Sequence, residues 1–311
     1  MVDAVSTVWA KKEGVYGTDA VPTGAANGIL TRNFSMKPVE MDRLDRNLDQ
    51  LIYGAQSSGV SNERMTMAYE VELAGSGAAG TAPRWMELLE GCGLDVPVLS
   101  AGIDAQQDFA LAGMPASSLT QYGYWQDQLR KMVGSVGTFS LDFTAGAYPF
   151  LSFNWLGLLA TTPFSKSAPG ETDLSDWVQP VEVNTDNTSF TLDGYAPALR
   201  SLKLDASVTT AIRNLVGKRY VRRGNHSMSG TMIVEAPDLA TKDYLSTLRS
   251  GMTVPWALDH GTVAGNIIAL SGTKAQITDI SESKEDDILM WTIGVTCTVD
   301  GGVSDISFSA E

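Results

Sequence analysis

The chain alternates apolar and polar residues in short runs, which is the pattern of half-buried β-strands. Met65, Met67 and Tyr69 form one apolar face and predict a strand over Glu63–Leu73, with a wet face and a dry face. A turn and a helix over Arg84–Glu90 follow this strand. The pattern therefore predicts a strand–turn–helix unit.

A second unit of the same kind is predicted over Ser229–Gly251. Thr231–Glu235 has the composition of a strand, and Asp238 is placed to cap a helix over Leu239–Arg249. Gly251 follows where a C-cap glycine is expected. A chain that builds one unit twice suggests an internal duplication.

The remaining elements recur in the same order in both parts of the chain. Further strands are expected at Leu30–Met41 with a break at Pro38, Tyr122–Val133, Gly137–Thr144, Leu151–Leu159 and Leu199–Leu204. Residues 1–28 have the composition of a loop, and Thr161–Trp177 that of an interdomain linker. We therefore predict a mainly β fold, a β-sandwich or barrel-like domain with a flanking helix, in two tandem copies over residues 1–165 and 166–311.

Composition narrows the classes of function. The 311 residues are 43% hydrophobic and carry a net charge of −14. Residues 1–165 hold 10 Lys and Arg against 17 Asp and Glu, and the rest hold 12 against 19, so both parts are acidic. This charge disfavours simple affinity for nucleic acid, because phosphate binding needs a positive surface. No apolar run approaches the roughly 20 residues of a membrane span, and the start lacks a signal-peptide pattern, so we expect folding in a cytoplasm.

Candidate catalytic, metal and cofactor motifs are weak. Gly75–Gly80 fits G-x-G-x-x-G, but the strand before it alternates and the second unit lacks the glycines, so a linker loop is favoured over a dinucleotide site. His226 and His260 are predicted to be surface or loop histidines, and Cys92 and Cys297 to be buried thiols. The acidic residues near Glu282 are predicted to form a solvated hairpin tip rather than a calcium site. We predict no catalytic residue, no cofactor and no metal.

Two long polar connections, Asp42–Asn62 and Asp205–His226, are more informative. The first mixes acidic and basic residues, whereas the second is basic. Connections of this length are uncommon in compact domains unless they are functional or disordered. Three interpretations stay open: solvated faces, mating surfaces for another copy of the chain, and a nucleic-acid site, which the lack of stacking aromatics beyond Tyr220 disfavours.

Three stretches carry a resemblance to a known family. They are VWAKKEGVYGTDAVPTGAANGIL near the start, GTFSLDFTAGAYPFLSFNWLGL in the middle, and DASVTTAIRNLVGKRYVRRG with SGTMIVEAPD and GTKAQITDISESKEDDI toward the end. Together they resemble tail tube proteins of long-tailed bacteriophages. The resemblance covers nearly the whole chain and rests on pattern and order rather than on one invariant motif.

The resemblance implies a virion protein whose domains assemble into rings. In that family each domain is β-sandwich-like with a flanking helix, six domains close a ring around a β-barrel wall, and rings stack through a long loop. The stacking loops here would be Asp42–Asn62 and Asp205–His226, and the ring helices Arg84–Glu90 and Leu239–Arg249. The charged candidates for ring stacking are Asp42, Arg43, Asp45, Arg46, Asp49, Arg213, Lys218, Arg219, Arg222 and Arg223.

Two domains in one chain would let three chains supply the six domains, so we expect a homotrimeric, pseudo-hexameric ring. DNA driven through the ring must not adhere, and a negative lumen would leave its phosphates hydrated. The candidate lumen-facing acids are Glu63, Glu70, Glu72 and Glu235.

The expected function is a structural subunit of a non-contractile, siphovirus-like tail tube, a conduit for genome ejection. It would reside in the virion tail after assembly in the host cytoplasm. Expected partners are other copies, the tape measure protein, the tail terminator and baseplate proteins, with double-stranded DNA only in transit and no membrane. The alternative is a tail terminator or baseplate hub ring protein. A β-rich hydrolase or dinucleotide enzyme is a third interpretation, and it would need a cluster of titratable groups that the sequence does not assemble.

Overall fold

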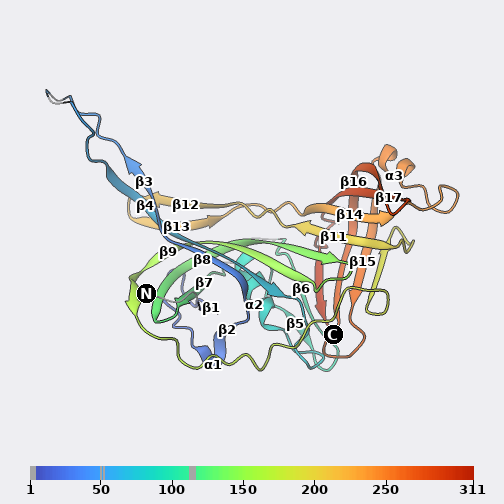
Figure 1. The fold of residues 1–311 in the computed structure, drawn as a ribbon, viewed down its shortest axis with the longest axis horizontal. Coiled ribbons are helices and arrows are strands. Elements are labelled where there is room, and N and C mark those ends of the chain that lie inside the picture. Colours follow the sequence, from blue (N-terminus) through green and yellow to red (C-terminus); the bar gives the residue numbers. More distant parts are fainter. Residues whose placement is uncertain (1–4, 50, 52, 112–116) are drawn as a thin grey trace.

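A computed structural model of the protein is mainly β, as the sequence predicts, and describes residues 5–49, 51, 53–111 and 117–311. Parts of the predicted connection Asp42–Asn62 (residues 50 and 52), of the stretch before Leu119 (112–116) and of the N-terminal loop (1–4) lie outside the described residues. Within the described ranges, sixteen strands share one sheet and two more form a separate hairpin. Figure 1 shows two β lobes side by side, joined by strands that run between them.

The first lobe contains the elements up to residue 166. They are β1 (Ser6–Lys12), α1 (Gly24–Asn27), β2 (Gly28–Ile29), β3 (Arg32–Leu44), β4 (Gly59–Glu72), α2 (Arg84–Cys92), β5 (Val98–Ser100), β6 (Asp104–Asp108), β7 (Leu119–Trp125), β8 (Gln128–Thr144) and β9 (Phe150–Lys166). Antiparallel pairing connects six of these strands in the order β1-β7-β8-β9-β4-β3.

The second lobe contains the elements after residue 166. They are β10 (Thr188–Leu192), β11 (Leu199–Asp205), β12 (Thr210–Leu215), β13 (Lys218–Arg223), β14 (Ser229–Glu235), α3 (Tyr244–Ser250), β15 (Thr253–His260), β16 (Ile268–Glu285), β17 (Ile288–Cys297) and β18 (Ser307–Ala310). Six of them pair in the order β10-β15-β16-β17-β14-β11.

The two pairing orders correspond strand by strand. The helix α2 follows β4 along the chain, and the helix α3 follows β14, which takes the same place in the second order. The lobes are joined where β11 pairs with the end of β8, from Ser201 opposite Thr144 to Asp205 opposite Ser140. We call this pairing the internal joint. It makes the strands β3, β4, β9, β8, β11, β14, β17 and β16 one continuous sheet across both lobes. The division into tandem copies at residue 165 stays a prediction, and β9 extends one residue past it.

Alternation along the strands sends one row of side chains into the core. Val71, Leu151, Leu141 and Leu204 are opposite one another on neighbouring strands, and each is at most 2% exposed. Aromatic rings continue this buried face along β9, where Trp155 stacks on Phe153 at 5.6 Å between ring centroids. Burial of such rings contributes much of the stability of a β core.

Several predicted strand boundaries are wrong. β3 continues through Pro38 to Leu44, which an edge strand tolerates because its outward side needs no N–H donor. The predicted strand Tyr122–Val133 is two strands, separated by a turn at Gln126 and Asp127. The predicted connection Asp205–His226 contains the β12–β13 hairpin.

The termini of the helices also differ from the predictions. Asp243, rather than Asp238, caps α3, because its side chain accepts a hydrogen bond from the Ser246 N–H. α3 therefore begins at Tyr244, and Gly251 caps its other end as predicted, at φ 65°. α2 ends at Cys92, with Gly93 as its left-handed cap.

The N-terminal segment and both cysteines contribute to the core. β1 contradicts the predicted N-terminal loop, since Val8 and Ala10 are buried in the main cluster. Cys92 and Cys297 are buried free thiols, as predicted, and burial raises the pKa of both.

His260 was predicted to lie on a surface or in a loop, and that prediction is wrong. It lies on β15 and is 1% exposed. Its Nε2 lies 3.2 Å from the Val181 carbonyl oxygen and therefore donates, while Nδ1 accepts from the Thr188 hydroxyl at 2.8 Å. A neutral ring satisfies both contacts, and burial favours it by lowering the pKa of His260.

The depressed pKa of His260 predicts a stability that depends on pH. The unfolded chain takes up a proton near the ordinary histidine pKa of about 6.5, whereas the folded chain takes it up only at lower pH. The contribution is therefore present above pH 6.5 and is lost as pH falls through the folded pKa. Urea unfolding of the monomer between pH 7.5 and 5.5 should show this loss, and His260→Gln should flatten it. An equally steep profile in His260→Gln would contradict the assignment.

Candidate assembly surface

The continuous sheet leaves an unpaired strand edge at each end. At one end, β3 pairs only with β4, so the other side of Arg32–Leu44 is open among the described residues. At the other end, β16 pairs with β15 only as far as Gln276, and no described strand pairs with residues 277–285 on that side. Unpaired N–H and C=O groups along an edge favour pairing with another strand.

The face of the continuous sheet that points away from the core is polar across both lobes. One row of directly opposed residues, each at least partly exposed, shows this: Glu70, Ser152, Ser140, Asp205, Ser229, Thr296 and Gln276. We call this surface the polar face.

Cations on the polar face are mostly paired with carboxylates. The Nε of Arg32 lies 2.7 Å from Glu70, and the Nζ of Lys203 lies 2.7 Å from Asp142. The face also carries acids for which no ion pair is found among the described residues, including Glu72 and Glu235. Its free charge is therefore negative.

The four predicted lumen-facing acids do not all share this face. Glu70 and Glu72 lie on it, and Glu235 takes the equivalent place at the end of β14, out of the register of the buried Met232 and Val234. Glu63 is two residues before the buried Met65, so it shares that side of β4 and lies opposite the polar face, nearer the outer end of the strand. The structure thus brings three of the four together on one surface.

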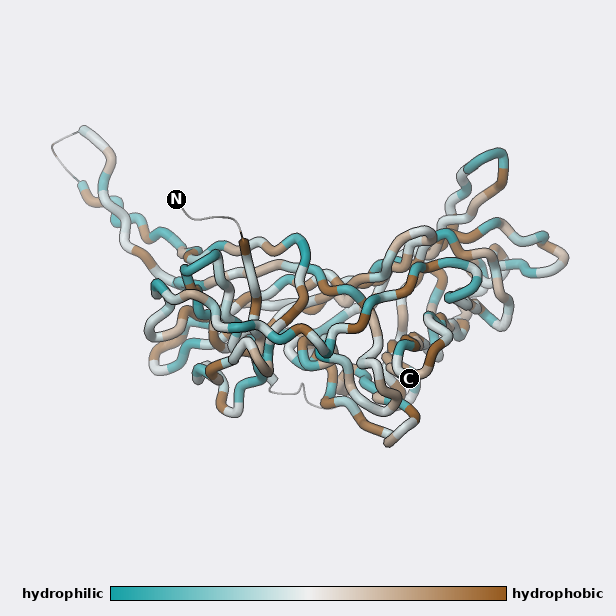
Figure 2. Tube along the Cα trace, turned by 60° about the horizontal axis from the view of Figure 1, so that its bottom comes forward, coloured by the Kyte–Doolittle hydropathy of each residue, from teal (hydrophilic) through white to brown (hydrophobic). Residues whose placement is uncertain are grey.

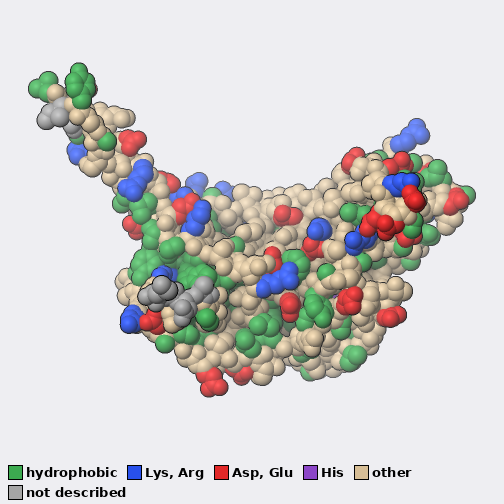
Figure 3. Space-filling view, viewed as in Figure 1, with side chains coloured by type: hydrophobic (Ala, Val, Ile, Leu, Met, Phe, Trp, Pro, Cys, Tyr) green, Lys and Arg blue, Asp and Glu red, His purple; other side chains and the backbone are tan. Residues whose placement is uncertain are grey.

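Two hairpins extend from the sheet in the same direction. We call the outer ends of β3 and β4 with the described residues between them (45–49, 51 and 53–58) the first arm, and β12–β13 the second arm. In Figure 1 the second arm runs from the second lobe across the first, and the first arm runs on beyond the first lobe. Figure 3 shows hydrophobic side chains at the tip of the first arm, where Leu51 and Tyr53 are fully exposed.

The ten predicted stacking residues are divided between the arms. Asp42 and Arg43 lie on β3, and Asp45, Arg46 and Asp49 follow it. The others lie on the second arm: Arg213 on β12, and Lys218, Arg219, Arg222 and Arg223 on β13. A hydrogen bond from Asn62 and the contact with Arg64, at 2.9 Å, lower the pKa of Asp42.

The second arm is held against the first lobe of its own chain. The Tyr16 hydroxyl oxygen accepts from the Val221 N–H at 2.6 Å and donates to the Gly134 carbonyl at 3.2 Å. The Arg223 guanidinium donates to the Gly91 carbonyl at the end of α2, at 3.1 Å. Burial lowers the pKa of Arg223. Arg223 therefore fixes the second arm within the chain.

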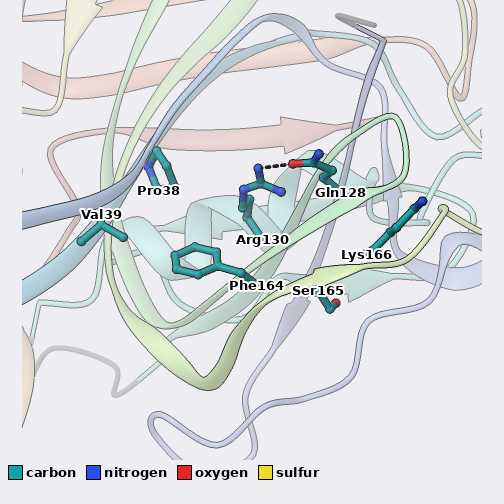
Figure 4. A pocket seen from close by; sticks show the side chains of 7 residues that line it. All are labelled: Pro38, Val39, Gln128, Arg130, Phe164, Ser165 and Lys166. Carbon is teal, nitrogen blue, oxygen red and sulfur yellow. Dashed lines mark hydrogen bonds between the residues drawn. The ribbon is translucent and has the colours of Figure 1, made fainter. Parts of the chain in front are cut away.

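A shallow hollow opens beside the free edge of β3. Figure 4 shows Pro38 and Val39 on one side, Gln128 and Arg130 behind, and the Phe164 ring across from them. Arg130 donates to the Gln128 side chain at 2.7 Å, and Phe164 is 42% exposed. The described lining is mainly apolar, and its charged side chains are the cations Arg130 and Lys166, with no acid among the lining residues, so the hollow has the character of a contact surface.

The other candidate motifs have structural explanations. The Gly77 N–H donates to the Gly265 carbonyl at 2.8 Å, and a Cβ on Gly75 would overlap the same loop of the second lobe, so close packing requires these glycines. His226 stacks on Phe109, with ring centroids 3.9 Å apart, and its Nε2 lies 3.1 Å from Asp305.

Glu282, Glu285, Asp286 and Asp287 lie at the exposed β16–β17 hairpin tip, as predicted. Within the described residues, no group of three or more His, Cys, Asp or Glu side chains is placed to hold a metal ion. The same part of the chain contains no helix that is long and apolar enough to cross a membrane.

The sequence pattern missed the residues that fix the second arm. Tyr16 was assigned to a loop. The buried Glu13 carboxylate holds this loop on β8, because it accepts hydrogen bonds from the N–H groups of Gly17 in the loop and Gly134 in the strand, each at 2.7 Å. The alternation in β12 and β13 around Gly217 was the available signal for a hairpin, since Gly217 has φ 85°.

Comparison with known proteins gives one family. The family model described as phage tail tube protein matches residues 4–305. No curated protein matches the chain. The match covers both lobes apart from β18, together with both arms and both free edges.

Proposed function

Because the chain belongs to the phage tail tube protein family, we propose that it is the repeating subunit of a tail tube wall, in which free sheet edges of neighbouring chains pair and close a ring. One observation carries the proposal: the continuous sheet ends in an unpaired β3 edge on one side and an unpaired β16 edge on the other. A head-to-tail contact of this kind repeats around an axis and ends when the ring closes.

The correspondence between the strand orders of the two lobes supports a ring of three chains. Each chain contributes eight strands to the continuous sheet, four from each lobe. We propose a duplicated tube domain, so that three chains supply six equivalent four-stranded segments. Closure of the sheet into a barrel removes the exposed edges.

The polar face is the surface proposed to line the lumen. Its serine and threonine rows and its unpaired acids would keep water between the wall and the DNA phosphates, so that a genome passes without adhering. Proposed partners are the tape measure protein inside the tube and terminator and baseplate proteins at its ends. A non-contractile tail in the virion, assembled in the host cytoplasm, completes the proposal.

Electron microscopy tests the proposed assembly. Negatively stained protein, concentrated after purification, should show rings or tubes with a central hole. Compact monomers at every concentration would contradict it. A terminator or hub ring is the second candidate: it would give single rings that do not stack, and few copies in the virion.

Charge reversal on the polar face tests the proposed lumen. Glu72→Lys with Glu235→Lys should leave tails complete but slow the release of DNA from virions triggered in vitro, because added cations attract phosphates. Glu171→Lys with Asp186→Lys, two exposed acids outside the sheet, is the matched control. Equal release by both double variants would show that the polar face does not line the lumen.

A further inference from the structure

We infer that the internal joint is the template for the joint between chains, so that β3 of one chain pairs with β16 of a second copy with Ser35 opposite Ser283. This inference rests on the proposed head-to-tail ring and adds the register and the position of the first arm.

The strands at the two joints occupy equivalent places in their lobes. β11 lies beside β14 at one edge of the second lobe, and β3 lies beside β4 at the same edge of the first. β8 is the strand that receives β11, on the side shared with β7. β16 is its counterpart, and its free stretch lies on the side shared with β15. A β3 edge therefore fits a β16 edge as β11 fits β8.

The register on the β16 side follows from strand pairings. Glu72 ends β4 and is opposite Phe150, which is opposite Asp142 of β8. Glu235 ends β14 and is opposite Met290, which is opposite Ser283 of β16. Since β4 and β14 each lead into the turn and helix of their lobe, Ser283 takes the place of Asp142.

The β3 side is located in the same way. Lys203, which is opposite Asp142 at the internal joint, is also opposite Thr231, four residues before Glu235. The residue four before Glu72 is Ala68, which is opposite Ser35. Ser35 therefore takes the place of Lys203 and faces Ser283 across the joint.

Burial agrees with this register. Ser35 and Ser283 are both exposed and lie on the polar face, while Phe34 and Met36 beside Ser35 are half-buried against the core. At the internal joint the corresponding residues, Leu202 and Leu204, are at most 2% exposed. Pairing with β16 would complete the burial of Phe34 and Met36, as the internal joint does for the two leucines.

The equivalence of the two joints also predicts where the first arm lies in the ring. At the internal joint the chain runs from β11 into the second arm, which lies on the neighbouring lobe and is fixed there by Tyr16. The first arm runs in the same direction from its own lobe (Figure 1). It would therefore lie across the second lobe of the next chain, where contact would cover its exposed Leu44 and Tyr53.

The two joints differ in one respect that matters for assembly. Lys203 and Asp142 form an ion pair at 2.7 Å inside the chain, whereas two serines meet between chains. The joint between chains therefore lacks the ion pair that the internal joint has.

Cysteine cross-linking tests the register. Ser35→Cys with Ser283→Cys should form a disulfide when assembled tubes are oxidised, because directly opposed residues bring Cα atoms within about 4.5–5.5 Å. Non-reducing gels should show covalent dimers and trimers and no larger product. Ser35→Cys with Glu282→Cys is the matched control: it places the second thiol on the opposite face and should give none. The native cysteines are buried and stay unchanged.

The other possible results distinguish a wrong register from a wrong proposed function. If tubes form but Ser35→Cys links efficiently to Ser281→Cys or Glu285→Cys instead, the register is wrong while the tube function stands. Products larger than three chains would overturn the three-chain ring. If the unmodified protein forms no rings or tubes, the proposed function itself fails.

Discussion

Phe143→Ala should destabilise the monomer by about 3–5 kcal/mol, the usual cost of emptying a buried aromatic site. Phe143 is fully buried at the internal joint, opposite Leu202, and its ring meets His260 edge-on at 5.5 Å between centroids. Its removal opens a cavity between the lobes. Urea unfolding monitored by tryptophan fluorescence measures the loss.

Tyr148→Ala is the control for this change, since Tyr148 follows the same strand but is 45% exposed. It should alter the free energy of unfolding by no more than about 0.5 kcal/mol. If Phe143→Ala lowered the free energy of unfolding as little as Tyr148→Ala does, the internal joint would not be part of the folded core. It could then not serve as a template for the joint between chains.

The second large effect is expected on assembly. Ser35→Glu with Ser283→Glu places like charges directly opposite each other at every joint between chains. Such pairs cost up to about 1 kcal/mol each, and three joints per ring would lower the ring association constant up to roughly 100-fold. Sedimentation velocity over a concentration series measures the shift in the onset of ring formation.

The opposite change should strengthen the ring. Ser35→Lys with Ser283→Asp installs between chains the ion pair that Lys203 and Asp142 form inside the chain. Rings should then appear at lower protein concentration, and added salt should reduce the gain. If both double variants assembled like the unmodified protein, Ser35 and Ser283 would not face each other.

Strongly alternating segments made much of the fold predictable. Met65, Met67 and Tyr69 are all buried on β4, and the same reasoning located β14. Turns without a sequence signal were missed. Gln126 adopts φ 51° without being glycine or asparagine, so the boundary between β7 and β8 left no mark in the pattern.

The assembly surface was less predictable, because it depends on which strand edges lack partners. Pro38 was taken as a break in a strand, whereas it marks the open edge of β3. The basic second arm was predicted to mediate stacking, but Arg223 is held by carbonyls of its own chain. Charge patterns identified both arms, whereas the strand pairing that positions the second arm joins residues 57 to 65 positions apart and left no local signal.

Cryo-electron microscopy of assembled tubes would show directly whether three chains join edge to edge into a closed wall. We expect rings of three chains with near-sixfold appearance, in which β3 of each chain continues the sheet at β16 of the next. Rings of six chains, or a wall in which either edge faces solvent, would contradict it.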